Sequence, residues 1–131
     1  MHTICYLSNK VPHVDLHNIE ELFETTQRNN LSNNITGILL YLDGNFLQVL
    51  EGKKEVIGPL FDSIMKDARH TSIFVILDKS IDDRTFNHYR SGFSVVKNQT
   101  DLSNLKEYLN ATVDIKTLSK SILGILEPFL L

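Results

Sequence analysis

The chain has 131 residues, of which 42% are hydrophobic and 22% are charged, and its formal net charge is −3. This length can bury a hydrophobic core without disulfide bonds, and the composition is ordinary for a single soluble globular domain. The slightly acidic balance, without a cluster of lysine and arginine, argues against nucleic acid or a membrane surface as the main partner. Because Cys5 is the only cysteine, an intramolecular disulfide and a thiolate metal site are excluded. The start, MHTICYLSNK, lacks the pattern of a signal peptide, so we expect a cytoplasmic protein.

The first predicted elements are a strand and a helix. The run HTICYLS is β-rich, and its alternation puts Tyr6 on one face of the strand. Asp15 is a good N-cap for a helix whose apolar stripe includes Leu22. Asn30 falls on this same stripe, which is an unusual place for an asparagine.

A β-hairpin is predicted for the segment GILLYLDGNFLQVLEG, residues 37 to 52. Its central Asp-Gly suits a type I′ turn, which places Leu39 opposite Gln48. The face that carries Gln48 is otherwise mostly apolar, so this amide is expected to be buried. A buried amide costs about 1–3 kcal/mol if its hydrogen bonds go unmade, so Gln48 needs a partner.

The remaining elements complete a recognisable order. We expect a second helix from about Lys54 to Arg69, a central strand at SIFVILD, a strand ending in FSVV, and amphipathic helices at Leu102–Leu109 and Ile115–Leu130. The last of these carries an apolar stripe that begins at Leu118 and Ile122. The order β-α-β-β-α-β-β with two trailing helices predicts an α+β, ferredoxin-like fold with a C-terminal two-helix cap.

Three polar residues are predicted to meet in one space between the sheet and its two covering helices: Tyr6, Asn30 and Gln48. Leu22 and Ile64 would form its apolar walls. Such a space suits a flat heterocycle with a polar edge, because side-chain amides can hydrogen-bond to alternating N–H and C=O groups on the edge of a ring. Each residue also has an ordinary explanation: a bonded core tyrosine for Tyr6, a helix C-cap for Asn30, and a water-facing strand position for Gln48.

Other chemistry finds little support in the sequence. The five histidines show no zinc-type spacing, and we find no paired carboxylates, nucleophile elbow, dinucleotide fingerprint or P-loop. The motif DARH at 67–70 could simply place favourable charge at the end of a helix.

The motifs CYLS, TTQRNN, ITGILLYLDGNFLQVLEG, DARH and RTFNHYRSGF together resemble the BLUF domain, a blue-light sensor that uses flavin. The resemblance runs from about residue 3 to residue 95, and the trailing helices resemble the cap of short stand-alone members. It predicts a flavin-binding core at residues 1–97 and a helical cap at residues 98–131.

The resemblance also implies roles for individual residues. Tyr6 and Gln48 match the light-reactive pair beside the flavin, and Asn30 matches the residue that holds the pyrimidine edge of the ring. The other positions matching cofactor-binding residues are Asn29 beside this edge, Leu22 and Ile64 as the aliphatic sandwich, and Arg69 and His70 near the ring edge and side chain.

The mechanism that the resemblance implies has no turnover. Blue light makes the flavin a strong oxidant, Tyr6 donates an electron, a proton passes through Gln48, and after recombination the Gln48 amide is left rearranged. The family usually has Trp and Met where this chain has Tyr89 and Ser91. We expect these two positions to lie on the last strand, so the difference affects how the signal would leave the flavin site. Thr26 stands where serine is common.

We therefore expect a photoreceptor without enzymatic activity that binds FAD, with FMN or riboflavin as alternatives. It would signal through its last strand and C-terminal helices to a separate protein, or across a homo-oligomer interface. Two other hypotheses remain: a cofactor-free interaction module with a degenerate pocket, and an acylphosphatase-like hydrolase, for which the Gly-rich phosphate loop is missing.

Overall fold

The computed structural model describes residues 1–116 and 118–129. The strands are β1 (His2–Lys10), β2 (Thr36–Leu42), β3 (Asn45–Gly52), β4 (His70–Ser80) and β5 (Phe93–Val96). The helices are α1 (Leu16–Ser32), α2 (Lys54–Met65), α3 (Gln99–Thr112), α4 (Ser119–Leu126) and a final 3₁₀ turn at Glu127–Phe129.

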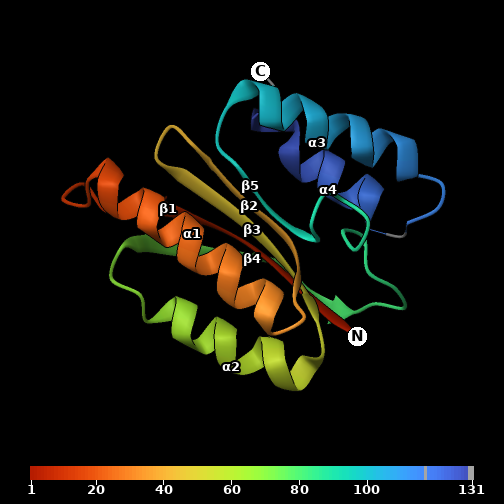
Figure 1. Ribbon diagram of the computed structural model, residues 1–131, viewed down its shortest axis with the longest axis horizontal. Coiled ribbons are helices and arrows are strands. Elements are labelled where there is room, and N and C mark those ends of the chain that lie inside the picture. The colour runs from red at the N-terminus through yellow and green to blue at the C-terminus, as the bar shows by residue number, and fades with distance from the viewer. Residues whose placement is uncertain (117, 130–131) are drawn as a thin grey trace.

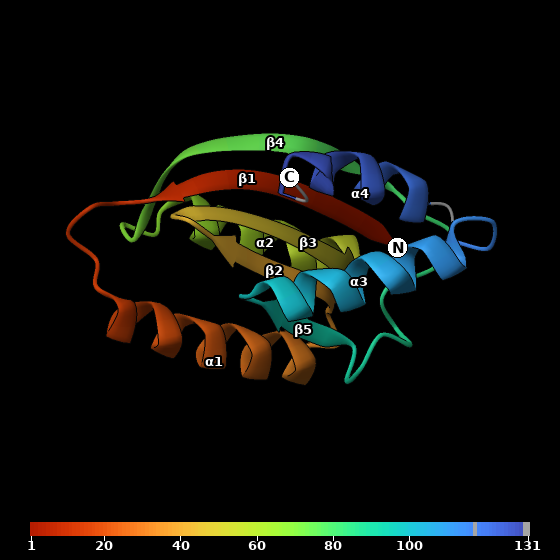
Figure 2. The same ribbon diagram turned by 90° about the horizontal axis from the view of Figure 1, so that it is seen from above.

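The five strands form one sheet in the order β4-β1-β3-β2-β5, antiparallel except for the β2–β5 pair (Figure 2). Figure 1 shows the sheet between two pairs of helices, with α1 and α2 on one side and α3 and α4 on the other. The predicted α+β, ferredoxin-like fold with a two-helix cap is confirmed. Among the described residues, no helix is long and apolar enough to cross a bilayer.

Alternating residues of β3 serve two separate hydrophobic cores. Phe46 and Leu50 belong to the core beneath α1 and α2, whereas Leu47 and Val49 belong to the core beneath α3 and α4. Because side chains alternate along a strand, Gln48 faces α1 and α2. The central strand therefore has one face available for a site and the other for the cap.

The hairpin forms as predicted. Asp43 and Gly44 have φ values of 52° and 82°, the positive angles that a type I′ turn requires at both central residues. Leu39 lies opposite Gln48 in the register, and Tyr6 lies opposite Gln48 from the other side. The hairpin turn therefore fixes which side chains surround this amide.

Two predictions for the middle of the chain are wrong, one for the end of a helix and one for the position of a strand in the sheet. The second helix ends at Met65 instead of Arg69, because the chain turns at Lys66 before the residues of the DARH motif. The SIFVILD strand lies at the edge of the sheet and is not central. Its apolar residues are poorly covered, since the side chain of Phe74 is 67% exposed. The pairing of β4 with β1 is also broken by two register shifts.

Two further expectations about the C-terminal half need correction. Tyr89 and Ser91 lie in the loop before β5, not on the last strand. Tyr89 packs on the cap side of the sheet, with its ring 4.7 Å from that of Tyr108 on α3. The last helix begins at Ser119 instead of Ile115, whose side chain is 75% exposed, and its predicted end at Leu130 lies outside the described residues. The predicted stripe is confirmed at Leu118 and Ile122, which are buried.

Candidate functional site

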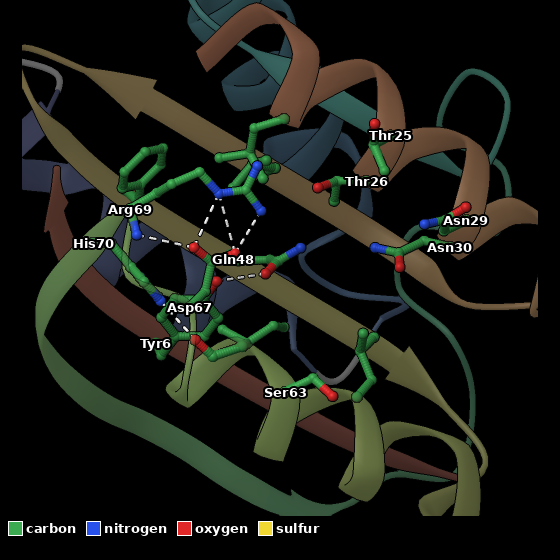
Figure 3. A pocket seen from close by; sticks show the side chains of 15 residues that line it. Tyr6, Thr25, Thr26, Asn29, Asn30, Gln48, Ser63, Asp67, Arg69 and His70 are labelled. Carbon is green, nitrogen blue, oxygen red and sulfur yellow. Dashed lines mark hydrogen bonds and ion pairs between the residues drawn. The ribbon is translucent and has the colours of Figure 1, made fainter. Parts of the chain in front are cut away.

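A cavity of about 210 Å³ lies between the sheet and the helices α1 and α2 (Figure 3). All eight residues predicted to bind a cofactor line it: Tyr6, Leu22, Asn29, Asn30, Gln48, Ile64, Arg69 and His70. They come from β1, α1, β3, α2, the loop that follows α2 and the first residue of β4. The fold therefore brings together side chains that are spread along the sequence from Tyr6 to His70 around one space.

Tyr6 and Gln48 form a buried hydrogen-bonded pair at the floor of this cavity. The Tyr6 hydroxyl donates to Gln48 Oε1 across 2.6 Å, and the two residues are only 4% and 3% exposed. Burial, with a smaller contribution from the Asp67 carboxylate, raises the pKa of Tyr6 above its ordinary value. The phenol is therefore a neutral O–H donor at physiological pH, and Gln48 is not a water-facing residue.

Asn30 presents an unpartnered hydrogen-bond donor. It lies inside α1, which continues to Ser32, so it is not the helix C-cap; that position belongs to Asn33. Asn30 is 3% exposed, and its Nδ2 has no hydrogen-bond partner among the described residues. In Figure 3 the amide nitrogens of Asn30 and Gln48 point toward each other across the cavity. Two such donors can be satisfied by an acceptor oxygen placed between them.

Apolar side chains form the walls of the cavity. Leu22 of α1 and Ile64 of α2 line it from the two helices, as predicted. Seven further lining residues were not predicted as site residues: Thr25, Thr26, Leu39, Phe46, Leu60, Ser63 and Asp67. Helical spacing put Thr26 on the stripe of Leu22, and it could also have identified Thr25, because residues three and four apart share a helix face.

Arg69 is held by an acidic neighbour at the end of the cavity. Its Nε donates to Asp67 Oδ1 across 2.9 Å (Figure 3). Hydrogen bonding from Arg69 lowers the pKa of the Asp67 carboxyl, which is therefore ionised at neutral pH. The charges of this pair largely cancel at the site.

His70 uses both ring nitrogens within the protein. Nε2 donates to the backbone carbonyl of Ile64 across 2.7 Å, and Nδ1 lies 2.7 Å from the Ser8 hydroxyl, from which a neutral ring accepts. The ring also stands nearly edge-on to Tyr6 and Phe46. His70 thereby ties the end of α2 to β1. No group of residues suited to a metal ion occurs in the part of the chain described.

Comparison with known proteins identifies the family. Residues 1–92 match the profile of BLUF, the sensors of blue light using FAD. The chain belongs to the BLUF family. BLUF domains bind flavin and signal to downstream effectors, so the cavity lies in a domain of a flavin-using sensor.

The relatives differ in the rest of their chains. Residues of this chain are 32% identical over 84 residues to photoactivated adenylate cyclase subunit beta of Euglena longa, covering 64% of this chain and 10% of that one. The blue light- and temperature-regulated antirepressor BluF of Escherichia coli (strain K12) is 33% identical over 75 residues, covering 57% of this chain and 19% of the antirepressor. The chain thus spans about a tenth to a fifth of these relatives.

Solved structures share the fold. The photo-activated state of BlsA has a TM-score of 0.69 and 27% identity, covering 100% of this chain and 86% of that chain. A structure of Klebsiella pneumoniae BlrP1 with FMN and cyclic diGMP has a TM-score of 0.70 and 30% identity, covering 83% of this chain and 29% of that one.

Proposed function

We propose that this BLUF chain is itself a blue-light photoreceptor that binds a flavin non-covalently in the cavity and signals through the Tyr6–Gln48 hydrogen bond. The observation that carries the proposal is the buried Tyr6–Gln48 pair next to the unpartnered amide donor of Asn30.

The side chains around the cavity fit the isoalloxazine ring of a flavin. A carbonyl oxygen on the pyrimidine edge of this ring would satisfy the facing donors of Asn30 and Gln48. Leu22 and Ile64 would lie against the two faces of the ring, since both line the cavity from opposite helices. In this proposal Asn29 contacts the same edge, while Arg69 and His70 lie toward the flavin side chain.

In this proposal the light-dependent switch is the hydrogen bond between Tyr6 and Gln48. Bound flavin would supply light absorption and, once excited, oxidising power. The Tyr6 proton lies on a 2.6 Å hydrogen bond to Gln48 Oε1, which is a short path for proton transfer. Rotation or tautomerisation of the Gln48 amide changes which of its atoms faces Tyr6, so the pair has two alternative hydrogen-bond arrangements.

We propose FAD as the bound flavin, because the family description names it. FMN and riboflavin are the alternatives. Arg69 is the cation that lines the cavity, but its guanidinium is paired with Asp67. A phosphate would therefore have to compete with this carboxylate for Arg69.

The remaining parts of the proposal concern the whole protein. We propose a core at residues 1–97 and a cap at residues 98–131, no enzymatic activity in this chain, a cytoplasmic location, and output to a separate protein or across a homo-oligomer. A cofactor-free interaction module accounts less well for the cavity, because it would leave the Asn30 donor buried without a partner, at a cost of about 1–3 kcal/mol.

Absorption spectroscopy tests the proposal directly. The purified chain, reconstituted with FAD if necessary, should be yellow and should show a reversible red shift of the flavin band after blue light. A chain that does not take up added flavin would contradict the sensor function. A yellow chain without a light-induced shift would retain the cofactor and contradict the photocycle.

A further inference from the structure

Glu51 is a buried carboxyl group that the proposed photochemistry does not use. It lies on β3, three residues after Gln48, and its side chain has no exposed surface. Its carboxylate oxygens accept hydrogen bonds from the backbone N–H groups of Thr85 and Phe86, at 2.6 and 3.0 Å, and from the hydroxyl of Thr36, at 2.9 Å. It therefore binds the loop between β4 and β5 to the sheet.

The same loop segment contacts the helical cap. We call residues 83–86 the junction. The Tyr108 hydroxyl of α3 donates to the Thr85 carbonyl across 2.6 Å, so the backbone of Thr85 is held from both sides. Lys116, which follows α3, pairs with Asp83 at 3.4 Å.

The junction is the main polar connection of the cap. In the ranges 1–116 and 118–129, the other side-chain hydrogen bonds of α3 and of the start of α4 stay between Lys97 and Ser119. The remaining contacts of α3 and α4 with the sheet are apolar. Apolar contacts are non-directional and tolerate small sliding, whereas hydrogen bonds depend on distance and angle.

The junction is also placed to respond to the cavity. Gln48 and Glu51 belong to one strand, with Gln48 facing the cavity and Glu51 holding the junction. After the junction the chain enters β5, where the carbonyl of Phe93 accepts a hydrogen bond from Gln27 of α1 at 3.0 Å.

We infer that Glu51 is a positioning residue that anchors the junction, and that the junction transmits the state of the Tyr6–Gln48 pair to α3 and α4. This inference rests on the proposed function. A rearranged Gln48 amide changes the hydrogen bonds at β3, and the short, directional bonds of Glu51 and Tyr108 pass the resulting displacement to the cap. The Tyr108 hydroxyl and the Lys116 ammonium are thus the contacts through which the cap receives the signal.

Hydrogen–deuterium exchange of the flavin-loaded chain in the dark and under blue light tests this inference. The variant Tyr108→Phe/Lys116→Met removes both polar links of the cap. Its matched control, Tyr41→Phe/Lys120→Met, removes a tyrosine hydroxyl and an exposed lysine that make no hydrogen bond to the described residues. In the parent and the control, light should change the exchange of α3 and α4 amides. We call Tyr108→Phe/Lys116→Met the uncoupled variant. In it, the light-dependent difference in exchange should fall at least about fivefold, the effect of one lost hydrogen bond, while the red shift stays unchanged.

A second variant tests the anchor. Glu51→Gln places an amide N–H group against backbone donors, so the Thr85 and Phe86 amides should exchange about tenfold faster in the dark.

An uncoupled variant whose cap responds to light as the parent does would overturn the inference alone, as would a parent whose red shift leaves α3 and α4 unchanged. A parent without any red shift would overturn the proposed function and this inference with it.

Discussion

The amide of Gln48 is the residue-scale feature on which the proposed light sensing depends. One end accepts from Tyr6, and the other is free to donate into the cavity. Gln48→Leu keeps a similar volume but removes both functions. We expect this variant to stay yellow and to lose the light-induced red shift, whereas Gln99→Leu, on the exposed start of α3, should photoconvert normally. Difference spectra before and after blue light measure both, and a normal red shift in Gln48→Leu would show that the role given to this amide is wrong.

Replacing Asn30 should have opposite effects on the stability of the flavin-free chain and on flavin binding. Its unpartnered Nδ2 destabilises the flavin-free chain, because a buried donor without an acceptor costs about 1–3 kcal/mol. Asn30→Leu should therefore raise the free energy of unfolding of the flavin-free chain by about 1 kcal/mol and weaken flavin binding by about tenfold or more. Urea unfolding and flavin titration measure the two effects. The exposed Asn110→Leu is the control, and tighter flavin binding by Asn30→Leu would argue against the assigned contact.

Residues of the site differ in how far the sequence could predict them. Tyr6, Asn30 and Gln48 were predicted because each interrupts an apolar pattern that is visible within a few neighbouring positions. The roles of Glu51 and Asp67 were not predicted. The partners of Glu51, Thr85 and Phe86, lie 34 and 35 residues further along the chain, so local patterns carry no sign of the contact. Asp67 was quoted within a motif, but its pairing with Arg69 depends on where α2 ends.

At the scale of elements, the hairpin was predictable to its register and β4 was misplaced. A two-residue Asp-Gly turn determines which residues face each other, so the register of β2 and β3 can be predicted from the sequence. The apolar composition of SIFVILD shows that a strand forms, but it does not show whether one or two neighbours flank it. The first register shift in β4 lies near Ser72, which has a φ of 58°. The early end of α2 was missed because no glycine or proline marks it.

Gly37 at the start of the hairpin gives an element-scale prediction. Its φ is 146°, and a Cβ atom added there would lie 1.8 Å from the backbone oxygen of Val49. Gly37→Ala should lower the free energy of unfolding by at least about 3 kcal/mol, since the β2–β3 pairing must open to admit it. Gly58→Ala in α2 meets no atom within 4 Å and should stabilise the chain by up to about 1 kcal/mol. Urea unfolding of both variants checks the pair, and a stable Gly37→Ala chain would contradict this close approach.

At the scale of the whole molecule, two buried acids predict a loss of stability at high pH. Burial raises the pKa of the Cys5 thiol to about 12 and also raises the pKa of Tyr6. Above about pH 9 the unfolded chain loses these protons while the folded chain keeps them, so the free energy of unfolding falls as pH rises. Each group contributes up to about 1.4 kcal/mol per pH unit. Urea unfolding between pH 8 and 11 should give a shallower decline in Cys5→Ala and in Tyr6→Phe than in the parent.

The overall topology followed from the sequence because strands and helices alternate in an order with few compact solutions. The location of Tyr89 and Ser91 did not follow. They lie in the loop before β5, where Tyr89 joins the aromatic rings of Phe86 and Tyr108. A tyrosine has the same apolar pattern in a loop that packs against a helix as in a strand, so only the tertiary contacts distinguish the two.

The outer strand β4 has a consequence for how the protein behaves in concentrated solution. A regular edge with exposed side chains such as Phe74 would act as a template for stacking further chains into fibrils. The two interruptions in its pairing with β1 bend this edge out of line, so an incoming strand can match only a few of its backbone groups at a time. We therefore expect the irregular pairing of β4 to disfavour fibril growth at this exposed apolar edge.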